Sequence, residues 1–116
     1  MLKVFIADDS RVVSDRMKEM LVEKGWIDIV GECGDAVEAI QSIRRLNQYV
    51  GILDFCMQGG EGLAVLKDIK TRKTKLVVIV LTAHPYPQYR HAFLAFGADT
   101  FFDKAKDIQK MNDLLI

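Results

Sequence analysis

The sequence predicts an α/β protein built on a central parallel sheet with helices on both faces. Short segments rich in β-branched and aromatic residues alternate with stretches in which apolar residues recur every three or four positions. This βα pattern repeats five times in 116 residues, which is enough chain for one compact domain spanning 1–116. The segment KLVVIVL, residues 75–81, is apolar on both faces, as is typical of a strand covered by helices above and below.

The first half of the chain contains two strand–helix units. The first strand, 2–7, leads into a helix that should end before Gly25, a residue type favoured just after helix C-termini. The second strand, 27–33, leads into a helix whose start is marked by Asp35 and Glu38, which resemble a capping box. The apolar faces are Val13, Met17, Met20 and Leu21 in the first helix and Ala36, Ile40 and Ile43 in the second.

The second half contains three more units. Their strands are predicted at 50–54, 76–81 and 99–102. Pro87 suits the first turn of the helix after the fourth strand, and Gly97 suits its C-cap. The apolar face of the last helix consists of Ile108, Met111 and Leu115.

Composition excludes several classes of partner. Lysine plus arginine and aspartate plus glutamate both number 16, so no overall charge attracts nucleic acid or an anionic membrane. The longest apolar run, 76–81, is far shorter than the roughly 20 residues that cross a bilayer, and the N-terminus lacks a signal pattern. Cys33 and Cys56 have no metal-binding spacing and are expected to be reduced thiols. We therefore expect a cytoplasmic protein that contacts neither membrane nor nucleic acid directly.

Chemically active residues follow four of the predicted strands. Right-handed crossovers and five units favour a flavodoxin-like (βα)5 sheet in the order 2-1-3-4-5, in which ligands bind beyond the carboxyl ends of the strands. Residues at those ends are Asp8 and Asp9 after the first strand, Asp54 at the third, Thr82 at the fourth and Lys104 at the fifth. The sequence therefore predicts that these side chains share one edge of the sheet.

Three carboxylates at one edge of the sheet repel one another, and a bound cation would reduce this repulsion. Two unit charges about 4 Å apart repel each other by roughly 1 kcal/mol in water and by about 4 kcal/mol at an effective dielectric constant of 20. Oxygen ligands together with a phosphate suit Mg²⁺, and the absence of nearby cysteine and histidine pairs argues against zinc. We therefore expect Asp8, Asp9 and Asp54 to form a magnesium site.

The sequence resembles one family over essentially its whole length, and four segments carry the resemblance. ADDS, ILDFCMQGGEG, VLTA and GADTFFDKA are similar to the motifs of the CheY-like response-regulator receiver domain of two-component signalling. The resemblance implies that Asp54 accepts a phosphoryl group from a histidine kinase or a histidine phosphotransfer protein. Such a domain catalyses its own phosphorylation and dephosphorylation but has no separate substrate, so we expect no enzyme in the usual sense.

The resemblance also implies roles for the surrounding residues. Asp9 would bind Mg²⁺ directly, Asp8 largely through water, and the backbone carbonyl of Cys56 would add a ligand. Lys104 would supply a fixed positive charge, Thr82 a hydroxyl that follows the phosphoryl group, and Phe101 a ring that changes rotamer. The altered surface would be the fourth helix, fifth strand and fifth helix, roughly 87–115, which binds a downstream partner or a second copy.

Simpler interpretations exist for each residue. Asp8 and Asp9 could cap a helix, and Lys104 could be a solvated surface lysine. Phe101 could serve only as a core aromatic residue.

Cys56 and His84 lie two residues after Asp54 and Thr82. In the family these positions flank the water that hydrolyses the acyl phosphate. They could tune its lifetime or be surface variation without a role.

The sequence departs from the family pattern at two positions. Gln58 and Ala105 stand where many members carry proline, so a trans peptide bond is expected between 104 and 105.

Two other functions stay open: an interaction module that works without phosphorylation, and a magnesium-dependent phosphatase. The adjacent aspartates in ADDSR differ from the DxD spacing of such phosphatases. The chain could be free-standing or part of a longer protein.

Overall fold

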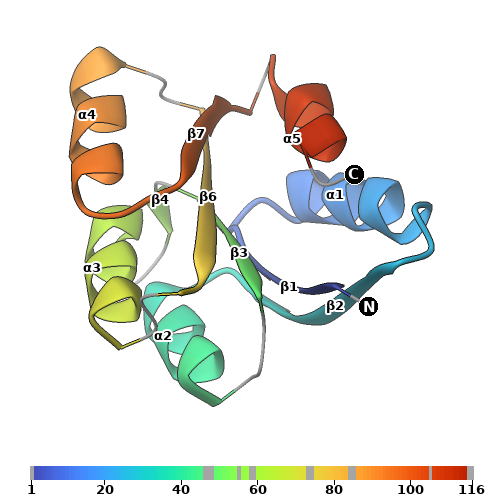
Figure 1. Cartoon of the computed structure of the whole chain (residues 1–116), viewed down its shortest axis with the longest axis horizontal. Coiled ribbons are helices and arrows are strands. Elements are labelled where there is room, and N and C mark those ends of the chain that lie inside the picture. The colour runs from blue at the N-terminus through green and yellow to red at the C-terminus, as the bar shows by residue number, and fades with distance from the viewer. Residues whose placement is uncertain are drawn as a thin grey trace.

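The computed structural model describes residues 2–45, 49–54, 56–57, 60–72, 75–83, 86–104 and 106–114. Helices and strands alternate along the chain (Figure 1). Their order is β1 (Leu2–Ala7), α1 (Arg11–Val22), β2 (Ile27–Cys33), α2 (Ala36–Arg45), β3 (Val50–Asp54), β4 (Cys56–Met57), β5 (Gly60–Glu61), α3 (Gly62–Arg72), β6 (Val77–Thr82), α4 (Pro87–Ala95), β7 (Thr100–Asp103) and α5 (Ile108–Leu114).

The main sheet has the predicted topology. Its five strands lie in the order β2-β1-β3-β6-β7, and every neighbouring pair is parallel. Since β6 and β7 are the fourth and fifth long strands of the chain, this is the predicted order 2-1-3-4-5. The fold prediction is confirmed, and the strand limits differ from the predicted ones by at most one residue.

Helices cover both faces of the sheet. Figure 1 shows α1 and α5 on one side of the strands and α2, α3 and α4 on the other. Alternate residues of β1 face opposite sides, so Val4 and Ile6 pack with α1 and α5, whereas Phe5 and Ala7 pack with the other helices. The core therefore consists of two apolar layers separated by the sheet.

Most of the predicted helix ends and faces are observed. Gly25 and Gly97 have φ angles of 77° and 109°, a region that favours glycine at helix C-termini. Asp35 Oδ1 accepts hydrogen bonds from the backbone N–H groups of Val37 and Glu38, at 2.9 and 3.1 Å, and so caps α2. Pro87 is the first residue of α4. Leu115, predicted on the face of the last helix, lies outside the described residues.

The sequence did not predict β4 and β5. These two-residue strands pair antiparallel, with Cys56 opposite Glu61 and Met57 opposite Gly60. Strands this short contain no full period of alternation, so no hydrophobic pattern marks them. Within the described ranges, no helix has both the length and the apolar character needed to cross a bilayer.

Candidate functional site

The parallel sheet brings the ends of four strands to one edge. Asp8 directly follows β1, Asp54 ends β3, Thr82 ends β6, and Lys104 directly follows β7. The strand-pairing register aligns these ends with one another, because Asp54 lies opposite Leu81 and Thr82 lies opposite Asp103. The predicted positions therefore meet as neighbours although they are far apart in the sequence.

Three carboxylates form a compact cluster at this edge. One carboxylate oxygen from each of Asp8, Asp9 and Asp54 lies within 4.8 Å of the others. Asp8 and Asp54 are buried, with 6% and 5% of their surface exposed, whereas Asp9 is exposed. The cluster thus has two buried members and one that reaches solvent.

Lys104 places a positively charged ammonium group inside the cluster. Its Nζ lies 3.0 and 2.9 Å from the two carboxylate oxygens of Asp8 and 3.3 Å from Asp54 Oδ2. The lysine side chain is only 12% exposed, and its backbone N–H donates to the Thr82 carbonyl at 2.7 Å. Lys104 is therefore a largely buried partner of two carboxylates and not a solvated surface lysine. The cluster contains three carboxylates, so this one ammonium cannot balance their full negative charge.

Burial and the neighbouring charges perturb the ionisation of Asp54. Burial raises the pKa of Asp54 to about 7, the charge of Asp8 and a hydrogen bond with Asp9 raise it as well, and Lys104 opposes the change. Burial also acts to lower the pKa of Lys104, but its contacts with Asp8 and Asp54 outweigh burial and raise it. Lys104 therefore stays charged while Asp54 holds a proton readily near neutral pH.

Ser10, not the acidic pair, caps the helix that follows. Ser10 Oγ accepts a hydrogen bond from the backbone N–H of Val13 at 3.4 Å, and Ser10 is the N-cap of α1. The backbone N–H of Ser10 donates to Asp8 Oδ1 at 2.7 Å, which fixes that carboxylate. Helix capping therefore does not account for Asp8 and Asp9.

Thr82 and Phe101 lie in the two neighbouring strands β6 and β7. Thr82 is fully buried, and Phe101 is 5% exposed. The Phe101 ring packs against Phe93, with centroids 5.9 Å apart, and Arg90 Nη1 donates to the Phe101 carbonyl at 3.1 Å. Phe101 thus belongs to the core in this structure, as the simpler interpretation expects, and its rotamer change stays a prediction.

The residues present fit a hard divalent cation. The cluster offers only carboxylate oxygens, which suit Mg²⁺ or Ca²⁺ and not zinc. In the part of the chain that the structure describes, this is the one group of three or more acidic, histidine or cysteine side chains close enough to share a metal.

Some predicted positions stay untested. His84, Gln58 and Ala105 lie outside the described residues, and so does the 104–105 peptide bond. Cys56 lies in β4, but nothing is described of its side chain, and its role as a carbonyl ligand stays a prediction.

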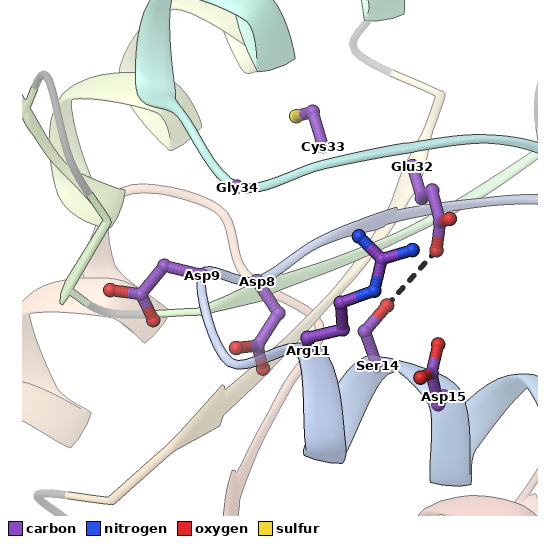
Figure 2. Close-up of a pocket in the computed structure, with 8 residues that line it drawn as sticks. All are labelled: Asp8, Asp9, Arg11, Ser14, Asp15, Glu32, Cys33 and Gly34. Carbon is purple, nitrogen blue, oxygen red and sulfur yellow. Dashed lines mark hydrogen bonds between the residues drawn. The ribbon is translucent and has the colours of Figure 1, made fainter.

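A polar pocket that was not predicted from the sequence lies beside the cluster. Its volume is about 320 Å³, and Figure 2 shows the side chains around it. The lining residues are Asp8, Asp9, Arg11, Ser14, Asp15, Glu32, Cys33 and Gly34. Glu32 accepts hydrogen bonds from Ser14 Oγ at 3.1 Å and Lys18 Nζ at 2.9 Å, and the bond from Lys18 lowers its pKa. The position of Glu32, Cys33 and Gly34 at the end of β2 was the available signal, because that end shares the edge with Asp8.

Comparison with known families identifies the family to which this fold belongs. The model of the response regulator receiver domain matches residues 4–116. The chain belongs to this family. The receiver-domain motifs seen in the sequence are thus the strand ends that the structure brings together.

Curated relatives of this receiver domain include transcriptional regulators. The transcriptional regulatory protein RcsB of Escherichia coli K12 is 33% identical over 96 residues, which cover 80% of this chain and 44% of RcsB. The DNA-binding transcriptional activator DevR/DosR of Mycobacterium tuberculosis is 29% identical over 111 residues, which cover 96% of this chain and 50% of that protein. The chain therefore spans about half the length of these relatives.

Solved structures agree with the fold. The isolated REC domain of RcsB from Salmonella enterica serovar Typhimurium, in the presence of the phosphomimetic BeF3-, matches with a TM-score of 0.88 and 30% identity over 98% of this chain and 87% of that one. The receiver domain of the response regulator NarL from Mycobacterium tuberculosis matches with a TM-score of 0.90 over 98% and 92% of the two chains, and its 24% identity supports the fold alone.

Proposed function

We propose that Asp54 of this receiver domain accepts a phosphoryl group from a phosphohistidine on a histidine kinase or a phosphotransfer protein. A carboxylate oxygen of Asp54 forms a bond to phosphorus while the bond from phosphorus to the histidine nitrogen breaks. The nitrogen keeps the electron pair of the broken bond, and the product is an acyl phosphate on Asp54. Hydrolysis of that bond returns the domain to its starting state, and no separate substrate is consumed.

One observation carries this proposal. Lys104 contacts both Asp8 and the candidate nucleophile Asp54 inside a nearly buried cluster. A fixed ammonium beside the reacting carboxylate can pair with a phosphoryl oxygen as negative charge accumulates there. A surface aspartate without such a partner would lack this stabilisation.

A divalent cation is part of the proposed function. Asp9 would hold Mg²⁺ directly, Asp8 largely through water, and Asp54 and the Cys56 carbonyl would add oxygen ligands. When bound, Mg²⁺ supplies positive charge that offsets the carboxylates and the incoming phosphoryl oxygens. Binding also favours the ionised form of Asp54, whose pKa is otherwise raised to about 7.

We further propose that phosphorylation is transmitted through Thr82 and Phe101 to α4, β7 and α5. The Thr82 hydroxyl would follow the phosphoryl group, and the Phe101 ring would respond in the space that it now shares with Phe93. To change a 1:99 population of active and inactive states to 99:1, phosphorylation must favour the active state by about 5.5 kcal/mol.

The altered face would bind a partner protein, an output domain or a second copy of the chain. One solved relative is RcsB from Salmonella enterica serovar Typhimurium bound to the promoter rprA in the presence of BeF3-. For the present residues we propose no direct contact with DNA, because their formal net charge is zero. A histidine kinase as donor implies a cytoplasmic location.

Phosphorylation by a small donor tests the proposal. We expect acetyl phosphate and Mg²⁺ to add one phosphoryl group, measured by intact-protein mass spectrometry. Asp54→Asn should abolish the mass gain, whereas Asp28→Asn, which removes an exposed carboxylate on β2, should retain it.

Two results would contradict the proposal. No mass gain in the parent protein would favour an interaction module that works without phosphorylation. Rapid multiple turnover of unrelated phosphate esters would favour a phosphatase.

A further inference from the structure

The chain after β2 passes directly against the acidic loop that follows β1. The backbone N–H of Asp8 donates to the Cys33 carbonyl at 2.9 Å. Figure 2 shows Cys33 and Gly34 on the segment that runs beside Asp8 and Asp9. The two segments are therefore in backbone contact at the start of the acidic loop that carries Asp8 and Asp9.

A side chain at position 34 would make tight contacts with the backbone of the acidic loop. A Cβ atom at position 34 would lie 3.2 Å from Asp9 Cα and 3.4 Å from the Asp8 carbonyl oxygen. Both are backbone atoms, so no flexible side-chain end can move aside. Contacts this short require a neighbour to shift by a few tenths of an ångström.

The surrounding contacts direct that shift toward Asp9. Asp8 is held by Lys104 and by the backbone N–H of Ser10. On the other side, Asp35 is fixed as the cap of α2 through its bonds to the next turn. Asp9 is the exposed member of the cluster, so fewer buried contacts oppose a shift there than at Asp8.

We propose that Gly34 is a positioning residue for the metal site: its missing side chain lets Asp9 approach Asp8 and Asp54 closely enough for all three to share one small cation. This inference rests on the proposed magnesium-dependent function. Gly34 itself touches neither the cation nor the phosphoryl group, and it acts through the backbone of Asp9.

The close approach favours Mg²⁺ over Ca²⁺. Mg²⁺ requires near-octahedral ligands at about 2.0–2.1 Å, whereas Ca²⁺ accepts variable geometry at about 2.3–2.6 Å. A ligand displaced by a few tenths of an ångström is thus poorly placed for Mg²⁺ and still usable for Ca²⁺. A side chain at position 34 therefore weakens Mg²⁺ binding more than Ca²⁺ binding.

Metal titrations of four proteins test the inference. Mg²⁺ and Ca²⁺ are titrated separately into the parent, Gly34→Ala, Gly34→Val and Gly25→Ala, and backbone amide shifts are followed by NMR. Gly25→Ala is the matched control because φ of 77° makes alanine strained there, while a Cβ at position 25 would meet no atom within 4 Å beyond its chain neighbours. It lowers stability without touching the acidic loop.

We expect the Kd for Mg²⁺ to rise about 10-fold in Gly34→Ala, as for other residues that orient metal ligands, and further in Gly34→Val. The Kd for Ca²⁺ should rise less, so the preference for Mg²⁺ falls. Gly25→Ala should leave both constants unchanged. All titrations are run in sucrose, which favours the folded state and keeps destabilised variants measurable.

Two outcomes overturn the inference while leaving the proposed function intact: an unchanged Mg²⁺ Kd in Gly34→Ala, or an equal loss of Mg²⁺ and Ca²⁺ binding. A parent protein that binds no Mg²⁺ contradicts the proposed function itself, and the inference falls with it.

Discussion

At the scale of single residues, the site combines two opposing electrostatic demands. Asp54 must be ionised to attack phosphorus, yet burial and the neighbouring carboxylates favour its protonated form. Lys104 offsets only part of this repulsion, because its single positive charge contacts two of the three carboxylates. The site is therefore under electrostatic strain until a cation binds, and this has consequences for stability.

The first consequence is a pH-dependent effect of Mg²⁺ on stability. The folded-state pKa of Asp54 is about 7, above its ordinary value of 3.8. Between these values the native state keeps a proton that the unfolded chain has released, so this residue makes the metal-free protein less stable as pH rises. Mg²⁺ binds the ionised form, so its stabilising effect should grow from pH 5.5 to pH 8.

Urea unfolding with and without Mg²⁺ at several pH values measures this effect. The Asp54→Asn variant separates the contribution of Asp54 from that of other carboxyl groups, including Glu32 and Asp107, whose pKa values are lowered. The difference in unfolding free energy between parent and variant should fall as pH rises without metal. A difference that does not depend on pH would contradict the account.

The second consequence concerns Lys104. In Lys104→Met, Asp8 and Asp54 remain buried beside each other without their cation. Removing one partner of a buried ion pair typically costs about 3–5 kcal/mol. We expect this loss in urea unfolding at pH 8 without metal, and a smaller loss at pH 5, where Asp54 is protonated.

Lys110→Met is the matched control for that measurement. The Lys110 side chain on α5 is 74% exposed, and among the residues that the structure describes its one ion pair is with Asp107, at 3.4 Å. Its replacement should change stability by less than about 0.5 kcal/mol. Equal losses for the two lysine variants would mean that Lys104 does not compensate the cluster.

At the scale of elements, α4 is held less firmly than α1. Phe93 is the one fully buried residue of α4, whereas α1 buries Ser14, Met17 and Leu21. The Arg90 bond to the Phe101 carbonyl adds a polar link between α4 and β7. A helix that buries so few side chains can move at a modest cost in free energy. This property suits a surface that responds to phosphorylation.

Hydrogen exchange tests this difference between helices. The central amides of α4 should exchange faster than those of α1 in the unmodified protein, because local opening exposes fewer buried apolar contacts. Adding Mg²⁺ and BeF3-, which mimics a phosphoryl group, should change exchange in α4 and β7 more than in α2. Equal protection of α1 and α4, or a response confined to the acidic loop, would contradict the transmission proposed here.

At the scale of the whole molecule, the topology explains why so much could be predicted from the sequence. Apolar β-rich runs mark the strands, apolar residues at three- to four-residue spacing mark the helices, and a parallel sheet places the carboxyl ends of its strands together. Asp8, Asp54 and Lys104 each stand at such an end, so their meeting follows from strand order alone. These site residues can therefore be predicted from the sequence once the strands are recognised.

Features that depend on the path of the backbone could not be predicted. The close approach of Gly34 to Asp9 arises from how two loops cross, and no periodic pattern encodes it. Capping by Ser10 was missed because three polar residues precede α1 and only the structure distinguishes them. The pairing of β4 with β5 is likewise too short to leave a pattern.

The position of the phosphoryl group tests the central claim most directly. The parent protein is treated with acetyl phosphate and Mg²⁺, and the modified residue is then located by peptide mass spectrometry, with a parallel sample in EDTA. The account predicts a single phosphoryl group on Asp54, formed with Mg²⁺ and absent with EDTA. A phosphoryl group on another residue, or equal modification in EDTA, would contradict it.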